Sequence, residues 1–355
     1  MHIFLKDLVN YFNALRSPVY AVFIDVKKAY DRIHHGKLFN KLLSRGIPIY
    51  IVKIIAFWYM NQQIQIRWGQ QYSVPFHVTN GIRQGGLISA AFFNLYMEDL
   101  TLQLAGTKVG CKIGKVIINH LAYADDMVLL APSPIALRVL LNICDTYSCL
   151  NNILYSTEKT LCMIFWPRRF KFKYNPIFMI QGEVLNYTNE FKYMGVLINP
   201  TLSDNSEIVK RAGKMYAAGN TVMSKFKNCS IACKILMFQT YCSNVYASAL
   251  WCNFNVFSYQ RIKVAHNDVF RMLLNERRGP NHSISRLFVE NRVNNLDSII
   301  RVAVYSLTSR IMTSENQLVV AVREGSPRIH SRLWRQWGIV LRRDARQDLL
   351  FFPHE

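Results

Sequence analysis

The sequence predicts an α+β fold in which a mixed sheet packs against helices. In the first half of the chain, segments with helical periodicity alternate with β-branched, strand-like runs. From about Pro200 the pattern becomes mostly helical and more basic, so we place a domain boundary between residues 199 and 200. The 355 residues are 51% hydrophobic, which is enough for substantial buried cores and excludes a disordered chain.

The helices of the first half are predicted from apolar residues at helical spacing, bounded by Ser, Pro or Gly. They cover residues 4–16, residues 28–45, a stretch that restarts at Pro48, a long stretch that follows the turn 81–86 and ends at about Leu104, and residues 135–150. The helix over 28–45 directly follows the first strand. We therefore expect strand and helix to alternate along the chain.

The strands are predicted from β-branched and apolar runs. They cover residues 19–26, a hairpin of 63–68 with 72–78, a second pair of 117–123 with 127–131, and two or three short strands between residues 161 and 198. The first run is apolar almost throughout, as is typical of a central strand buried on both faces. Only three residues separate the second pair, so we expect a tight hairpin with an acidic turn.

The charge favours a polyanionic partner. Forty-three Lys and Arg face 22 Asp and Glu, a net charge of +21, and nucleic acid or an anionic membrane surface would attract such a chain. Residues 47–60 form the longest apolar stretch, but Pro48 and Lys53 interrupt it and it is too short to span a bilayer. We expect no membrane partner, no secretory signal, and a location inside the cell, in the nucleus or the cytoplasm.

Carboxylates stand where two apolar strands end. Asp25 lies at the far end of the first strand, and Asp125 and Asp126 lie in the turn of the second pair. If these strands are neighbours, the acids converge, and rigid carboxylate oxygens suit Mg²⁺. Two such ions about 3.5–4 Å apart would serve an in-line phosphoryl displacement. For the Asp-Asp dipeptide alone, a simple turn is the better interpretation.

The order of several motifs resembles the palm of reverse transcriptases, most closely that of non-LTR (LINE-type) retrotransposons. The segments that resemble palm motifs A, B and C, the following Lys-bearing motif and the primer-grip hairpin are residues 23–31, 81–89, 123–126, 154–160 and 191–196. The resemblance covers about residues 19–198. It implies a right-hand polymerase palm with partial fingers over residues 1–199, and a helical, basic thumb and C-terminal extension over 200–355.

The resemblance also implies a metal site. It makes Asp25 and Asp125 the principal ligands, Asp126 the third carboxylate and the Val26 carbonyl a further oxygen. Two Mg²⁺ ions, or Mn²⁺ in their place, would bind there. The implied ligands agree with the acids that the strand pattern singles out.

Nucleotide-binding residues are implied in the same way. Tyr30 corresponds to the aromatic residue beneath the incoming sugar, where its bulk would obstruct a 2′-hydroxyl. Gln84 would lie beside the nascent pair, Gly85 would let the backbone approach the nucleotide, and Lys159 would neutralise the triphosphate or protonate the leaving pyrophosphate. By residue type alone, Tyr30 could pack in the core and Lys159 could be a solvated charge.

Two further segments are candidate nucleic-acid contacts. Met194 and Gly195 match the primer grip. Basic residues alternate with aromatic ones in a pattern that suits a groove for a nucleic-acid backbone, at Arg168, Arg169, Lys171 and Lys173. A strand with one charged face explains this alternation equally well. The arginines between residues 323 and 346 also favour a phosphate-contacting surface.

The implied function is RNA-directed DNA synthesis with an RNA template, a DNA primer and deoxynucleoside triphosphates as partners. Only 24 residues precede Asp25, too few for complete fingers, and no segment corresponds to an endonuclease. We therefore expect a fragment or decayed copy of a longer natural product. The alternatives are a catalytically inactive remnant that only binds RNA or DNA, and an RNA-templated RNA polymerase, against which Tyr30 argues.

Overall fold

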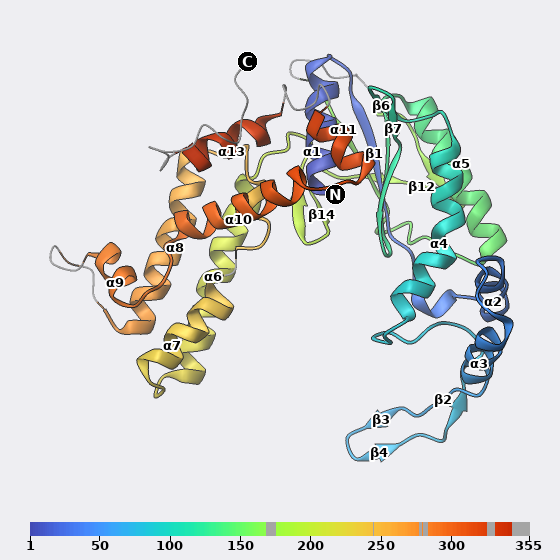
Figure 1. Cartoon of the computed structure of the whole chain (residues 1–355), viewed down its shortest axis with the longest axis horizontal. Helices are drawn as coiled ribbons and strands as arrows, with labels where there is room; N and C mark the ends of the chain where they lie inside the picture. The colour runs from blue at the N-terminus through green and yellow to red at the C-terminus, as the bar shows by residue number, and fades with distance from the viewer. Residues whose placement is uncertain (168–174, 244, 277–278, 280–282, 325–330, 343–355) are drawn as a thin grey trace. The chain divides into compact units, whose positions relative to one another are not determined.

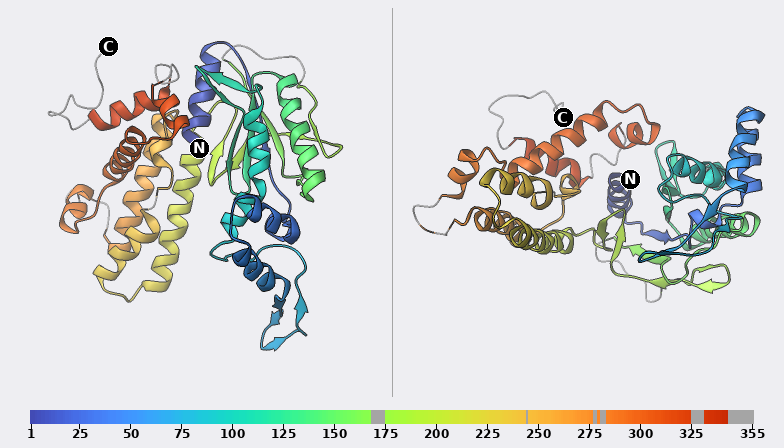
Figure 2. Two further views of the ribbon diagram at one scale, coloured as in Figure 1. Left: turned by 45° about the vertical axis from the view of Figure 1, so that its right-hand side comes forward. Right: turned by 90° about the horizontal axis from the view of Figure 1, so that it is seen from below.

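The computed structural model describes residues 1–167, 175–243, 245–276, 279, 283–324 and 331–342 of the chain. These residues belong to two compact units. The sheet unit comprises residues 16–189, and the helical unit comprises residues 1–15 together with 190–355. Figures 1 and 2 show the elements of each unit.

The sheet unit combines helices with short strands. Its helices are η1 (a 3₁₀-helix, Tyr30–Arg32), α2 (His35–Ser44), α3 (Ile49–Met60), α4 (Ser89–Gly106) and α5 (Pro134–Asn151). Its strands are β1 (Val19–Ile24), β2 (Gln63–Ile64), β3 (Arg67–Trp68), β4 (Gln71–Tyr72), β5 (Phe76–His77), β6 (Cys111–Ile113), β7 (Val116–Ile118), β8 (His120–Tyr123), β9 (Asp126–Ala131), β10 (Leu161–Phe165), β11 (Met179–Ile180), β12 (Glu183–Val184) and β13 (Asn186–Tyr187).

A five-stranded sheet with the order β13-β10-β1-β9-β8 forms the centre of the sheet unit. β1 pairs antiparallel with both β9 and β10, and β13 runs parallel to β10. All six residues of β1 are buried. The predicted central strand and the α+β fold class are therefore confirmed.

Two long helices cover one face of this sheet. α4 and α5 lie side by side in Figure 1 and pack against each other and the sheet. Val22 of β1 and Leu129 of β9 share a buried core with Leu100 of α4 and with Leu137 and Leu140 of α5. Full burial of each such side chain contributes about 1.5–3 kcal/mol. This packing holds the strands that carry Asp25 and Asp126.

The predicted helix over residues 28–45 is wrong at its start. Lys28 has a φ of +52°, which is left-handed and cannot continue a right-handed helix. The chain instead forms a turn and η1, and α2 begins only at His35. His34 caps α2, because its Nδ1 accepts a hydrogen bond from the Lys37 amide at 3.4 Å.

The predicted strand over residues 117–123 is divided at Asn119. β7 pairs with β6, whereas β8 pairs with β9. The buried Asn119 side chain donates hydrogen bonds to the carbonyls of Leu104 and Val109, at 2.6 Å and 2.9 Å. These bonds fix the chain at the point where it leaves one pair and enters the other. Residues 161–198 likewise contain more short strands than predicted.

The helical unit contains one hairpin, of β14 (Phe191–Tyr193) with β15 (Val196–Ile198), among the residues that the structure describes. Its other elements are α1 (His2–Ala14), α6 (Asn205–Phe226), α7 (Ile231–Met237), η2 (a π-helix, Phe238–Cys242), η3 (a 3₁₀-helix, Ser248–Leu250), α8 (Val256–Leu274), α9 (Ile284–Glu290), α10 (Leu296–Met312), α11 (Gln317–Glu324) and α13 (Arg332–Arg342). α6 and α8 approach closely at Gly219, where a Cβ atom would lie 2.7 Å from Val269. The mostly helical second half is as predicted.

Buried charges join α1 to the C-terminal part of the helical unit. Lys6 of α1 forms an ion pair with Asp204 at 2.5 Å and donates to the Leu250 carbonyl at 2.8 Å. Both charged side chains are almost fully buried. α1 and the 191–198 hairpin belong to the same compact unit as the C-terminal helices. For this reason the two units differ in extent from the predicted domains 1–199 and 200–355. The palm and thumb names of those domains stay predictions.

The helices differ in length and in apolar content. α4 and α5 have 18 residues each, and α6 has 22. No helix in the described parts of the chain is both long and apolar enough to span a lipid bilayer.

Replacing Lys6 by Met should destabilise the helical unit strongly. The variant leaves the Asp204 carboxylate buried without its cation, and breaking a buried pair in this way costs about 3–5 kcal/mol. Urea unfolding followed by circular dichroism measures the change. The control is Asp99→Asn, which removes the ion pair between Asp99 and Lys41. Because the Asp99 side chain is 53% exposed, this change should cost at most about 1 kcal/mol. Equal losses for the two variants would contradict this prediction.

Candidate active site

The pairing of β1 with β9 brings Asp25 and Asp126 together. The last pair in the register is Ile24 with Met127, so Asp25 follows directly opposite Asp126. Directly opposite residues of an antiparallel pair have their Cβ atoms about 4.5–5.5 Å apart and their side chains on the same face. Asp125 lies in the adjoining two-residue turn, after Ala124 with its φ of +53°. The structure thus gathers the three predicted acids at one end of the sheet.

A turn that follows α5 holds the backbone of Asp25. The Asp25 amide donates to the hydroxyl of Thr160 at 3.2 Å, and the Asp25 carbonyl accepts from the Ser156 amide at 2.8 Å. Thr160 is fully buried. Lys159 is exposed in the same turn, next to Thr160. The predicted triphosphate lysine is therefore carried by a turn that is bonded directly to Asp25.

The backbone of Val26 lies beside the bonds that hold Asp25. Backbone groups of successive residues in a strand point to alternate sides. Both backbone groups of Asp25 point to the side of the 156–160 turn. Val26 lies opposite Tyr155 in a β-bridge, but the bonds of this bridge are formed by Asp25 and Lys27, not by the backbone groups of Val26. The Val26 carbonyl therefore points away from the 156–160 turn.

Burial and the neighbouring acids raise the pKa of Asp126. The pKa of Asp126 lies above its ordinary value of 3.8 because partial desolvation disfavours the carboxylate, and because the charges of Asp125 and then Asp25 repel it. Within the described residues, none of these three carboxylates forms an ion pair with Lys or Arg. Uncompensated carboxylates at one place favour a bound cation.

The arrangement fits an open cation site. In the described part of the chain, no three His, Cys, Asp or Glu side chains are grouped closely enough to enclose a metal ion by themselves. Mg²⁺ is usually held by one or two carboxylates and takes its remaining ligands from water and substrate phosphates. Asp25 and Asp126 opposite one another, with Asp125 beside them, supply oxygens of this kind.

Tyr30, five residues after Asp25, packs against helix α4. Its ring is stacked on Phe93 of α4, with centroids 5.3 Å apart and an interplanar angle of 12°. Its carbonyl accepts a hydrogen bond from the Ile82 amide at 2.8 Å. The ring is only partly buried, so Tyr30 both packs against the core and keeps an accessible surface.

The glycine-rich turn is tied to the same segment. A Cβ atom at Gly81 would lie 2.9 Å from the Asp31 Cα, so only glycine permits this approach. His35 donates from its Nε2 to the Gly81 carbonyl at 2.7 Å. Gln84 and Gly85 follow, both exposed, and Gly85 has a φ of +81°. Hydrogen bonds to the chain that follows Asp25 therefore anchor the turn carrying the predicted nucleotide contacts.

Met194 and Gly195 form the turn of the β14–β15 hairpin in the helical unit. Both have positive φ, of +43° and +81°. The Gly195 carbonyl accepts from the Arg211 guanidinium at 2.9 Å, and the buried Glu207 carboxylate accepts from the Leu197 amide at 3.1 Å. Arg211 and Glu207 also form an ion pair with each other. The predicted primer-grip turn is thus fixed from α6.

The remaining residues predicted to contact nucleic acid are two groups of basic side chains. Arg168, Arg169, Lys171 and Lys173 lie outside the described residues. Among the predicted C-terminal arginines, Arg323 donates to the carbonyls of Met312 and Ser314 and to Glu324. These bonds within its own unit make Arg323 a poor candidate for phosphate contact.

Sequence reasoning missed the residues that position the site. Thr160 bonds Asp25 across 135 positions of the chain, and His35 bonds Gly81 across 46. A buried Thr next to Lys159 carries no sequence signal of its own, because its partner is set only by tertiary structure. His35 lies inside the predicted helix over residues 28–45, and that pattern gave no reason to assign it a contact with Gly81.

The comparisons with known proteins find reverse transcriptases. The family model described as reverse transcriptase (RNA-dependent DNA polymerase) matches residues 3–198. The polyprotein of the type-2 retrotransposable element R2DM of Drosophila melanogaster is 32% identical over 126 residues, which cover 35% of this chain and 12% of that protein. The RNA-directed DNA polymerase of the mobile element jockey of Drosophila funebris is 28% identical over 208 residues, which cover 56% and 22%.

These relatives are much longer than the matched segments, since the chain spans 12% and 22% of their lengths. Among solved structures, the apo telomerase of Candida tropicalis has a TM-score of 0.42 at 12% identity, covering 91% of this chain and 56% of that one. The telomerase of Candida tropicalis in complex with a fragment of telomeric RNA has a TM-score of 0.41 at 13% identity, covering 91% and 51%.

Replacing Asp126 by Asn should raise the free energy of unfolding at pH 7. Because the folded-state pKa of Asp126 is raised, its ionised form is disfavoured in the folded chain, and the variant removes that penalty. The gain should shrink as the pH falls through the raised pKa, and vanish below the ordinary value of 3.8. Chemical unfolding at several pH values measures it.

The control for this pH series is Glu183→Gln, which removes an exposed carboxylate from β12 of the same unit. Substitutions of this kind change stability by about 0.5 kcal/mol or less. A loss of stability at pH 7 in the Asp126→Asn protein would contradict the prediction.

Proposed function

The chain belongs to the reverse transcriptase (RNA-dependent DNA polymerase) family, and from this premise we propose that it extends a DNA primer by copying an RNA template. Deoxynucleoside triphosphates are the proposed substrates, and the proposed sites of action are the nucleus or the cytoplasm. The observation that carries the proposal is the placement of Asp25 opposite Asp126, at the sheet end that also carries Asp125.

We propose that these three carboxylates and the Val26 carbonyl hold two Mg²⁺ ions, for which Mn²⁺ can substitute. When bound, such ions stabilise the negative charge of the attacking and leaving oxygens in phosphoryl transfer. The protein holds the ligands in place through the strand pairing of β1 and through the bonds from Thr160 and Ser156 to Asp25. The raised pKa of Asp126 supports the need for a cation beside it.

The other residues bind and orient the substrates in this proposal. Lys159, exposed beside Thr160, neutralises the triphosphate or donates a proton to the leaving pyrophosphate. Tyr30, backed by Phe93, excludes a 2′-hydroxyl by its bulk. Gln84 and Gly85 lie against the nascent pair and the nucleotide. Met194 and Gly195 contact the primer strand.

Replacing Asp125 by Ala should abolish primer extension while template binding stays unchanged. Binding depends mainly on backbone phosphates, whereas the chemistry depends on the carboxylates. The measurements are extension of a DNA primer on an RNA template in Mg²⁺, and template affinity by fluorescence anisotropy. A chelator should stop extension, and added Mg²⁺ should restore it.

The matched control for this variant is Asp145→Ala in α5, an acid whose carboxylate accepts from the Gln181 amide and which we assign no catalytic role. It should retain extension. If the unmodified chain and the Asp125→Ala protein bind the template alike and neither extends the primer, the chain is a binding remnant and the proposal is wrong.

Replacing Tyr30 by Ala should relax discrimination against ribonucleotides by about tenfold or more, a typical range for a steric pocket. Tyr30→Phe keeps the ring against Phe93 and should keep the discrimination. The measurement compares incorporation of ribo- and deoxynucleoside triphosphates by the three proteins. Equal use of both sugars by the unmodified chain would remove the assignment of Tyr30 and favour RNA synthesis.

A further inference from the structure

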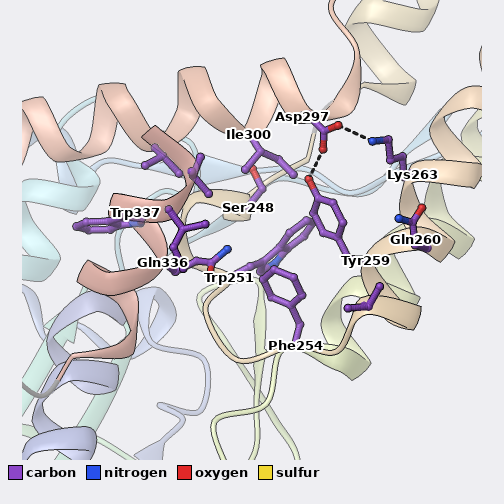
Figure 3. A pocket seen from close by; sticks show the side chains of 14 residues that line it. Ser248, Trp251, Phe254, Tyr259, Gln260, Lys263, Asp297, Ile300, Gln336 and Trp337 are labelled. Atoms are coloured by element: carbon purple, nitrogen blue, oxygen red, sulfur yellow. Dashed lines mark hydrogen bonds and ion pairs between the residues drawn. The ribbon is translucent and has the colours of Figure 1, made fainter. Parts of the chain in front are cut away.

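A cavity in the helical unit has no part in the proposed reaction. It has a volume of about 240 Å³ and lies among α8, α10, α13 and the segment that precedes α8. Its walls include four aromatic side chains, two of them tryptophans (Figure 3). The residues that decide its chemistry are Ser248, Trp251, Phe254, Tyr259, Lys263 and Trp337.

Two buried polar groups line this cavity without a partner. The Ser248 hydroxyl and the Trp251 indole N–H form no hydrogen bond within the described residues, although both residues are only 3% exposed. By contrast, the neighbouring Trp337 indole donates to the Ala249 carbonyl at 2.6 Å. A buried donor without an acceptor is unfavourable. A ligand that brings an acceptor to either group would remove that cost.

The walls and the rim favour a flat ligand. The rings of Phe254 and Tyr259 are stacked, with centroids 5.4 Å apart and an interplanar angle of 21°. The Tyr259 hydroxyl donates to Asp297, which also forms an ion pair with Lys263 (Figure 3). Asp297 therefore neutralises Lys263, so the cavity offers aromatic surface and hydrogen-bond donors but no free cation for a phosphate among the described lining residues.

We propose that this cavity receives an unpaired nucleobase of a nucleic-acid strand held by the helical unit. A base is flat, stacks on aromatic side chains whatever its identity, and carries ring nitrogens and carbonyl oxygens that accept hydrogen bonds. The volume of about 240 Å³ is below the range of about 300–1,000 Å³ that suits drug-sized ligands, and it suits a single ring system. The inference rests on the proposed function for the presence of a strand.

Photocrosslinking tests this site without requiring catalysis. The probe is an oligouridine RNA about ten nucleotides long, a length within the usual site sizes for single strands, that contains 4-thiouridine. A matching DNA with 4-thiothymidine is the second probe. Mass spectrometry locates the crosslinks, which we expect at residues 251–263. Crosslinks from one probe identify RNA or DNA as the source of the base.

Two variants and a matched control complete the test. Ser248→Ala and Trp251→Phe each remove one unpartnered group, and each should weaken binding about threefold to tenfold, the range for one lost hydrogen bond. Ser243→Ala is the control, since Ser243 is also buried and its hydroxyl also lacks a partner among the described residues, but it does not line the cavity. Affinity is measured by fluorescence anisotropy.

The proposal is overturned if both probes crosslink only elsewhere, or if the pocket variants bind like the control. The absence of any crosslink would also overturn the proposal. In that case a protein segment would be the better candidate for the occupant of the cavity. Because primer extension is not measured in this test, a chain that fails to copy RNA can still crosslink at the cavity. Likewise, a chain that copies RNA can lack the base site. Failure of the proposed function and failure of the proposed base site are therefore distinguishable.

Discussion

The antiparallel pairing of β1 with β9 is the interaction on which the candidate site depends. It places Asp25 opposite Asp126, and a slip of the register by one residue would turn the whole side-chain pattern of a strand to the other face. Such a slip is prevented because β1 is buried along its length between β9 and β10. The acids therefore owe their proximity to the core rather than to the flexibility of a loop.

This arrangement imposes an electrostatic cost in a chain that is otherwise strongly basic. The chain carries a net charge of +21, yet within the described residues no Lys or Arg neutralises Asp25, Asp125 or Asp126. The pKa of Asp126 is raised by desolvation and by the charges of Asp125 and Asp25. A lysine in an ion pair with these acids would offset both effects and would also compete with a metal ion. The unpaired acids therefore lower the stability of the folded chain, and they fit the proposed cation site.

Much of this site could be predicted from local patterns. The buried run of β1 and the short acidic turn after β8 are properties of neighbouring residues, and both were expected. The contacts that join distant segments were not, because Thr160 bonds Asp25 across 135 positions and Asn119 divides a predicted strand through bonds to distant carbonyls. The left-handed conformation of Lys28 was likewise hidden, since its side chain gives no signal for it.

In the helical unit, the turn at Met194 and Gly195 is also held by residues that are distant in the sequence. A two-residue turn with both φ values positive favours Asn-Gly, and a left-handed residue other than glycine costs about 1–2 kcal/mol. Met194 nevertheless adopts a φ of +43°. The Arg211 guanidinium bonds the next carbonyl and is paired with the buried Glu207, so α6 offsets this strain. Bonds with Arg211 and Glu207 hold this turn in place, which the proposed contact with a primer strand requires.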